Sequence, residues 1–196
     1  SKKAGKQFFN TDSNFNIAEF MHFCSRMLKK EPKKAGEAPA MIVFCSFEQM
    51  QMVIDYGKKY GFNNSYPLYF IKNYSPQVLK ANMKIVGATE HAVVLYREKL
   101  PKFNNNGRMI FNWMEWNKDN SVPRIHPTQK PLPLLKKLIR IFTDEGDVVI
   151  DPVAGSGVTL KAAAETNRNS YGFEVDRNFF REAKEKMLKN IQYSLF

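Results

Sequence analysis

Residues 147–157 read DVVIDPVAGSG and decide the fold class of this 196-residue chain. DVVID (147–151) is an apolar run typical of a buried strand, and Gly155 and Gly157 allow the backbone to approach a ligand without an intervening Cβ. The pattern of 158–167 then predicts a helix, and SYGFEVD (170–176) predicts the next strand. This order predicts an α/β fold: a doubly wound, mostly parallel Rossmann-like sheet, with helices on both faces and a ligand at the strand ends.

Two helices flank this unit in the sequence. The first presents one apolar face and ends at Gly146; the face consists of Leu134, Leu135, Leu138, Ile139 and Phe142. Asp176 is a good N-cap for the second, whose apolar residues are Phe179, Phe180, Ala183, Met187 and Ile191.

The first hundred residues alternate in the same way. Asn16, with Glu19 three places on, resembles a capping box that opens a helix reaching about Lys30, before Pro32. MIVFCSF (41–47) predicts a strand, and a helix over roughly 47–60 should end at Gly61. Two further strands are expected at 66–72 and 91–97.

The remaining segments show no regular pattern. Residues 1–14 are polar and basic and are expected to form a mobile loop, and residues 73–90 are expected to be irregular. Between 98 and 124 no period is visible and the composition shifts to Asn, Lys, Trp and Phe, which predicts an inserted loop or small lobe outside the core.

The length of 196 residues favours a single domain, and the charge favours an anionic partner. A formal net charge of +11 attracts polyanions such as nucleic acid, although a lysine-rich surface also serves solubility alone. Residues 124–140 add five basic residues and no acid. No apolar run approaches the ~18 residues of a membrane span, and Cys24 and Cys45 lack metal-type spacing, so we expect a cytoplasmic protein with reduced cysteines and no metal.

Glu174 narrows the choice of ligand. It lies 17 residues after Gly157 at the end of the next strand, where a carboxylate can accept hydrogen bonds from both ribose hydroxyls. The dinucleotide fingerprint requires a third small residue at position 160, which is leucine. Asp151 would repel a pyrophosphate but suits the cationic amino and sulfonium groups of S-adenosyl-L-methionine.

HPTQKP (126–131) stands before the helix that leads to this unit. HPTQKP, a helix, DPVAGSG (151–157) and GFEVD (172–176) together closely resemble the β class of DNA amino-methyltransferases, which modify adenine N6 or cytosine N4. The motifs cover about 126–176, and the strands at 41–47, 66–72 and 91–97 match the family's catalytic half more loosely.

The resemblance implies a set of cofactor-binding residues. Lys130 and Thr128 would line the pocket, Glu174 would hold the ribose, and His126 would position its neighbours rather than act as a base. The methionine moiety would be held by Asp151, Val153, Gly155, Ser156 and Gly157.

The sequence departs from the family at the catalytic signature, which is Asp, Asn or Ser, then Pro-Pro, then an aromatic residue. No Pro-Pro dipeptide occurs in the chain. Because residues 1–14 resemble the loop that follows this signature, we expect the signature immediately before Ser1, and Ser1 near Gly155. The catalytic residues are therefore unknown here, and the fragment alone should bind cofactor without methylating.

The resemblance therefore predicts methyl transfer from S-adenosyl-L-methionine to adenine N6 in double-stranded DNA, by a modification or orphan methylase. Cytosine-N4 methylation, RNA amine methylation and an inactive cofactor- or DNA-binding module are the alternatives. Within one domain, 1–97 would be the catalytic half, 98–124 a target-recognition insertion and 125–196 the cofactor half. The resemblance also implies two further partners, a cognate restriction endonuclease and a second copy of the chain.

Candidate DNA-binding residues are Lys102, Arg108, Trp113 and Arg124, although the aromatic residues of this segment could equally cover a sheet edge or a dimer contact.

Overall fold

The computed structural model describes residues 15–74 and 77–191, so the predictions made for residues 1–14 lie outside the described part of the chain. Its largest sheet has the order β1-β5-β2-β6, formed by β1 (Met41–Cys45), β2 (Asn64–Lys72), β5 (Thr89–Tyr96) and β6 (Trp113–Trp116). β5 is antiparallel to both β1 and β2, whereas β6 is parallel to β2. Three of the four strands therefore share one direction, and β5 is reversed.

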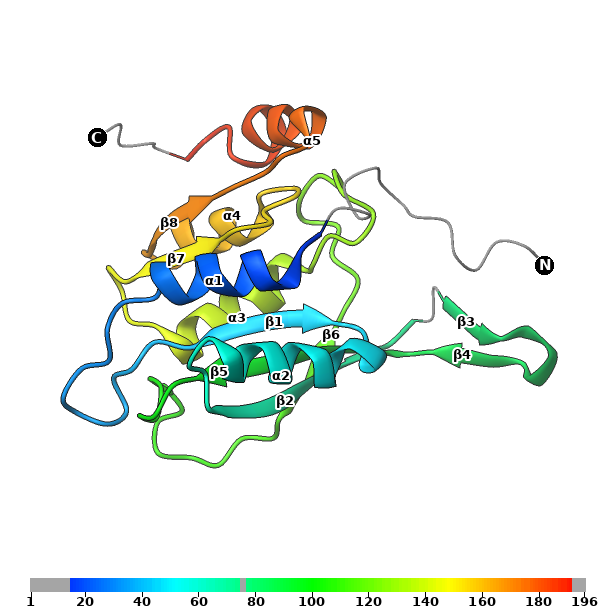
Figure 1. The fold of residues 1–196 in the computed structure, drawn as a ribbon. Coiled ribbons are helices and arrows are strands. Elements are labelled where there is room, and N and C mark those ends of the chain that lie inside the picture. The colour runs from blue at the N-terminus through cyan, green and yellow to red at the C-terminus, as the bar shows by residue number, and fades with distance from the viewer. Residues whose placement is uncertain (1–14, 75–76, 192–196) are drawn as a thin grey trace.

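The glycine-rich unit forms a second, two-stranded sheet. β7 (Val148–Asp151) pairs in parallel with β8 (Asn169–Gly172), connected by α4 (Val158–Ala164). In Figure 1 the arrow of β7 points to the same side of the molecule as that of β1. The α/β class predicted from the sequence is confirmed, with a mixed sheet.

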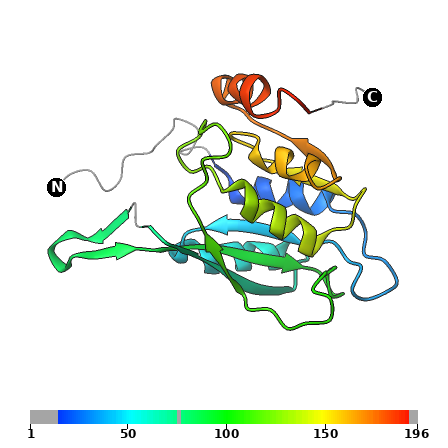
Figure 2. The same ribbon diagram turned by 180° about the vertical axis from the view of Figure 1, so that it is seen from behind.

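Side chains alternate along β5 and bury both faces of the larger sheet. Val93 and Leu95 pack with α1 (Ile17–Met27) and α2 (Met50–Lys59), whereas Ala92 and Val94 pack toward α3 (Leu132–Phe142). All four side chains are fully buried, which makes β5 the centre of this part of the core. Figures 1 and 2 show α1 and α2 on one face and α3 on the other.

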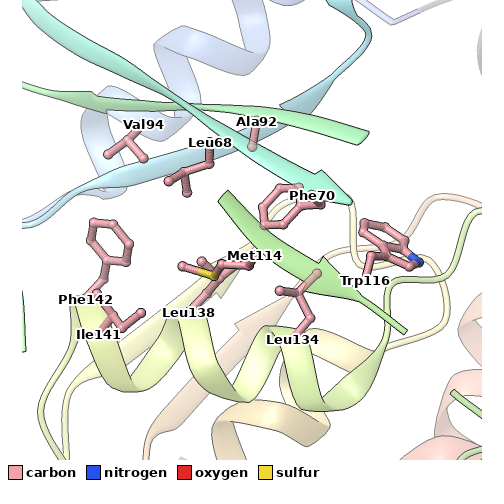
Figure 3. Packing of buried hydrophobic residues seen from close by; sticks show 10 residues of the cluster. All are labelled: Leu68, Phe70, Ala92, Val94, Met114, Trp116, Leu134, Leu138, Ile141 and Phe142. Carbon is pink, nitrogen blue, oxygen red and sulfur yellow. The ribbon is translucent and has the colours of Figure 1, made fainter. Parts of the chain in front are cut away.

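The α3 helix packs against both sheets. Leu134, Leu138 and Ile141 pack under the four-stranded sheet (Figure 3), whereas Leu135 and Ile139 pack against α4 and β7. The apolar face predicted for this helix therefore serves two hydrophobic clusters at once.

The prediction that the segment 98–124 lies outside the core was wrong for residues 113–116. Its residues Trp113–Trp116 form β6, the edge strand of the four-stranded sheet. Met114 and Trp116 are buried against α3 (Figure 3), and the Trp116 indole N–H donates to the Tyr74 hydroxyl at 3.2 Å. Four residues are too few for a strand period to stand out from their neighbours.

The prediction of irregular structure for 73–90 was also wrong. β3 (Gln77–Lys80) and β4 (Ile85–Gly87) form an antiparallel hairpin, closed by the 3-10 turn η3 (Ala81–Met83). Lys84 ends that turn in the left-handed region at φ 53°. The hairpin projects from the body of the molecule in both Figure 1 and Figure 2.

Most helix boundaries follow the local signals. The Asn16 side chain accepts hydrogen bonds from the N–H groups of Ala18 and Glu19, so it caps α1 as predicted. The predicted helix of 47–60 consists of η2 (Phe47–Gln49) followed by α2, and Gly61 follows at φ 87°. Asp176 caps the short helix α5 (Arg177–Glu182), which continues into the π-helical turn η4 (Ala183–Met187) rather than to Ile191.

Over the described residues, no helix is both long and apolar enough to cross a membrane.

Candidate cofactor site

The turn after β7 adopts the backbone geometry that its glycines allow. Gly155 and Gly157 have φ values of 51° and 75°, in the left-handed region that disfavours residues with a Cβ. The Asp151 side chain accepts from the Val153 N–H at 3.1 Å, which closes the start of the turn. Gly157 then serves as the N-cap of α4, so the turn delivers the chain directly into that helix.

Glu174 lies against this turn. One carboxylate oxygen accepts from the Gly155 N–H at 2.7 Å, and the other accepts from the Asp176 N–H at 2.7 Å. Backbone bonds between the β7 and β8 ends support the contact, because Ala154 donates to the Phe173 carbonyl and Phe173 donates to the Asp151 carbonyl. The acidic residue and the glycine turn, 19 positions apart, therefore form one polar surface at the strand ends.

The HPTQKP loop covers the other side of the turn. A Cβ at Gly155 would lie 3.7 Å from the His126 ring, and His126 also contacts the Phe179 ring at 4.6 Å between centroids. His126 Nδ1 accepts from the Thr128 N–H at 3.2 Å and lies 2.9 Å from the Thr128 hydroxyl. These contacts hold the imidazole beside the turn, and its positioning role stays a prediction.

Lys130 and Asp151 supply opposite charges to the same region. Burial lowers the pKa of Lys130, and the carboxylates of Glu90 and Asp151 oppose that shift. Burial likewise raises the pKa of Asp151, opposed by hydrogen bonds from Thr159 and Val153 and by the charge of Lys130. The Lys130 ammonium donates to the Thr128 carbonyl at 3.1 Å and lies 5.2 Å from the centre of the Phe44 ring.

A cavity of about 280 Å³ opens beside the turn, lined by Glu19, Phe20, Phe23, Pro152 and Phe173. Phe23 and Phe173 meet edge to face at 5.4 Å between ring centroids, so α1 and the end of β8 share one aromatic wall. The helix predicted to begin after Asn16 supplies Phe20 and Phe23 to this cavity, a role that the sequence did not indicate. No local pattern could have done so, because the contact joins residues 150 positions apart.

The predicted cofactor residues are brought together at the turn, and Val153 and Ser156 lie at the two extremes of exposure. Thr128, Lys130, Asp151, Gly155, Gly157 and Glu174 surround the turn through the contacts described above. Val153 is 60% exposed at the outer side of the turn, whereas Ser156 is only 2% exposed. A carboxylate, an aromatic wall and an open glycine backbone fit an adenosine-type ligand with a cationic tail.

The four candidate DNA-binding residues do not form one cluster. Lys102 forms an ion pair with Asp144, just after the end of α3. Arg124 donates to the Pro127 carbonyl at 3.3 Å, beside the HPTQKP loop. Trp113 is 43% exposed and stacks on Phe111, and Arg108 is exposed in the turn before it.

The basic stretch 124–140 is also divided by the fold. Lys130 lies 5.2 Å from the centre of the Phe44 ring of β1, whereas Lys136 forms an ion pair with Glu165, which follows α4, at 2.8 Å. The basic side chains of this stretch therefore do not all lie on one surface that DNA could contact.

Relatives of the chain are DNA methyltransferases. It is 23% identical to the type II methyltransferase M.HpaI of Haemophilus parainfluenzae, over 93% of this chain and 64% of that protein. It is 27% identical to the DNA adenine methyltransferase YhdJ of Escherichia coli (strain K12), over 76% of this chain and 47% of that protein. The chain thus spans less than two thirds of the length of these curated relatives.

Solved structures of such enzymes share the fold. The M1.HpyAVI–SAM complex superposes with a TM-score of 0.72 at 26% identity, covering 90% of this chain and 84% of the other. The cytosine-N4-specific PvuII DNA methyltransferase superposes with a TM-score of 0.70 at 17% identity, covering 98% and 78%, and this likeness concerns the fold alone.

A family model described as DNA methylase, for N6 and N4 methyltransferases, matches residues 3–185. The cofactor predicted from the glycine turn and Glu174, S-adenosyl-L-methionine, is the one this family uses. The chain belongs to the N6/N4 DNA methylase family.

Proposed function

We propose that this chain is the cofactor-binding and substrate-facing part of an enzyme that methylates adenine N6 in double-stranded DNA. One observation carries the proposal: the HPTQKP loop, the glycine turn and Glu174 converge on Gly155, which His126 and the Glu174 carboxylate contact from two sides. Three motifs far apart in the sequence thereby form a single site at the strand ends, where open α/β sheets bind their ligands.

Each residue has a defined task in this proposal. Glu174 orients the ribose, the backbone of the glycine turn accommodates the methionine moiety, and Asp151 provides negative charge for its cationic groups. S-adenosyl-L-methionine supplies a methyl group on a positively charged sulfur when it is bound. Lys130 and Thr128 form a further part of the pocket, and the aromatic cavity beside Phe23 and Phe173 suits the flat face of the adenine ring.

The proposed place of the catalytic signature follows from two strand edges. Among the described residues, β1 pairs only with β5 and β7 only with β8, so each has one edge without a ladder partner. Val43 and Phe44 of β1 and Val149 and Ile150 of β7 are only half-buried, unlike the central residues of β5. Strands at the centre of a doubly wound sheet are normally buried on both faces.

Helices on both faces already bridge these two edges. On one face, α1 packs Met21 against the β1 side and Phe23 against Phe173 beyond β8. On the other face, the cluster around Leu135 and Ile139 of α3 has both Phe44 and Val149 packed against it. We propose that one further strand pairs between β1 and β7 and carries the Asp/Asn/Ser-Pro-Pro-aromatic signature at its carboxyl end, beside Lys130 and Gly155.

Adenine is proposed as the target, with cytosine N4 as the alternative. The relative YhdJ is named as an adenine methyltransferase, whereas PvuII, which shares the fold alone, is cytosine-N4-specific. A cognate restriction endonuclease and a homodimer stay predictions.

The test is methyl transfer by a longer protein that contains this chain together with the proposed strand. It should be incubated with duplex DNA and isotope-labelled S-adenosyl-L-methionine, and the DNA should then be digested and its nucleosides identified by mass spectrometry. Labelled N6-methyladenine is the expected product. N4-methylcytosine would move the assignment to the alternative, and cofactor binding without any DNA methylation would identify an inactive module.

Hydrogen exchange tests the proposed strand separately. The backbone amides on the free edges of β1 and β7 should exchange more slowly in the longer protein than in residues 1–196 alone. The amides that link β2 and β5 provide the control, because they already have partners. Equal exchange of the β1 and β7 amides in both proteins would exclude a strand between them.

A further inference from the structure

The hairpin of residues 77–87, called the β-arm here, has no role in the site described above. Its main contacts are between its own two strands, and its side chains are largely exposed. Val78 is 61% exposed, Met83 68% and Val86 51%. An isolated two-stranded hairpin is only marginally stable in water, and exposed apolar residues gathered on one projection mark an interaction site.

The charge of the β-arm is entirely positive. No acidic residue occurs between Lys72 and Glu90, and the arm carries Lys80 and Lys84 on either side of its tip. Both lysines are exposed, and Met83 lies between them in the sequence KANMK (80–84). Two cations flanking an exposed apolar side chain complement a polyanion better than they complement a basic protein such as this chain itself.

The β-arm also extends from the side of the molecule on which methylation would occur. It connects the carboxyl end of β2 to the start of β5, and β2 is parallel to β6 and shares the direction of β1. In Figure 1 the arm projects at the end toward which the arrows of β1 and β7 point, the end that also holds the glycine turn after Asp151. Figure 2 shows the same relationship from behind.

We propose that the β-arm binds duplex DNA beside the target base. Lys80 and Lys84 contact backbone phosphates, and Met83 enters a groove and inserts between base steps, as apolar side chains do in proteins that deform the duplex. The inference rests on the proposed function, because it presupposes that DNA is the substrate. It adds a contact that acts at a distance from the cofactor and that none of the four residues predicted from the sequence supplies.

The salt dependence of DNA affinity tests the two lysines. Each phosphate contact contributes about one unit to the slope of log K against log salt, so Lys80→Ala/Lys84→Ala should lower that slope by about two. The matched control is Lys29→Ala/Lys30→Ala. These two exposed lysines follow α1, at the opposite end of the molecule from the arm (Figure 1), and their removal should leave the slope unchanged.

Met83→Ala tests the apolar tip. It should weaken binding to duplex DNA several-fold and leave the salt slope unchanged, because no charge is lost. All variants should retain the wild-type affinity for S-adenosyl-L-methionine, since the arm does not reach the glycine turn.

The outcomes separate this inference from the proposed function. If the wild-type protein binds no DNA, the proposed function fails first. If the wild type binds DNA and the arm variants bind it equally well with the same salt slope, the β-arm does not contact DNA and the inference is overturned. If sedimentation shows that the arm variants turn a dimer into a monomer while the slope stays the same, the arm is a dimer contact, which also overturns it.

Discussion

The Glu174 carboxylate accepts a hydrogen bond from the backbone N–H of Gly155 at 2.7 Å, which joins the end of β8 to the turn after β7. Its second oxygen accepts from Asp176, the cap of α5. The residue proposed to hold the ribose is therefore already oriented by the protein, and no side-chain ordering is left for the ligand to impose. Pre-organisation of this kind lowers the entropic cost of binding.

Replacement of Glu174 should weaken cofactor binding. Glu174→Ala removes a charged acceptor, and we expect a loss of about 1–3 kcal/mol in the binding of S-adenosyl-L-methionine by titration calorimetry. Glu174→Gln retains one acceptor oxygen and should lose less. Glu182→Ala, on α5, breaks an ion pair with Lys186 and should bind normally. Tight binding of NAD by the wild type would contradict the cofactor assignment.

Asp151→Asn should stabilise the protein without cofactor at neutral pH. Burial raises the pKa of Asp151, so the folded state binds its proton more tightly than the unfolded chain does. The stability of the wild type should therefore fall as the pH rises from about 4 through the raised pKa, and asparagine should abolish this fall. Melting temperatures of both proteins at about pH 4 and pH 7 measure the difference. The exposed substitution Asp55→Asn is the control, and a D151N variant less stable than the wild type at pH 7 would contradict the argument.

The two tryptophans of β6 should behave differently. Trp116 is 5% exposed in the cluster that contains Leu134 and Leu138 of α3, and Trp116→Ala should lower the free energy of unfolding by about 3–5 kcal/mol. Trp113 is 43% exposed, and Trp113→Ala should change it by no more than about 0.5 kcal/mol. Urea unfolding distinguishes the two, and equal effects would show that the two tryptophans do not differ in burial in solution.

Gly157→Ala should destabilise the protein more than Gly61→Ala does. Both glycines have positive φ, which costs a residue with a Cβ about 1–2 kcal/mol. A Cβ at Gly157 would in addition lie 3.3 Å from both Ala183 Cβ and Leu188 Cδ1, whereas the space around Gly61 is open. Thermal unfolding of the two variants provides the comparison, and an equal decrease in melting temperature would mean that α4 and η4 shift apart at little cost.

Arg124 and Lys102 should differ in their effect on DNA binding. Arg124 lies beside the HPTQKP loop, so Arg124→Ala should lower the salt slope of DNA affinity by about one. Lys102 is paired with Asp144 after α3, and Lys102→Ala should leave the slope unchanged. If Lys102→Ala lowered the slope and Arg124→Ala left it unchanged, the duplex would lie against the Lys102 surface and not beside the HPTQKP loop.

The sequence by itself determined the parts of the protein that rest on local patterns. The strand, glycine turn and helix of 147–164 follow from apolar runs and glycines within one segment, and Asn16 and Asp176 cap their helices through bonds to residues two and three places on. The association of Glu174 with the glycine turn was also readable, because the spacing of two adjacent parallel strands is set by the helix between them.

Only the tertiary structure decided which distant segments meet. β6 is a strand because β2 supplies its hydrogen-bond partners and α3 covers Trp116, and neither is visible in residues 113–116 alone. The aromatic wall of Phe23 and Phe173 and the pairing of Lys102 with Asp144 likewise depend on packing between elements far apart in the chain. Such contacts cannot be derived from local patterns, because a pleated edge or an apolar face accepts any partner that the topology brings to it.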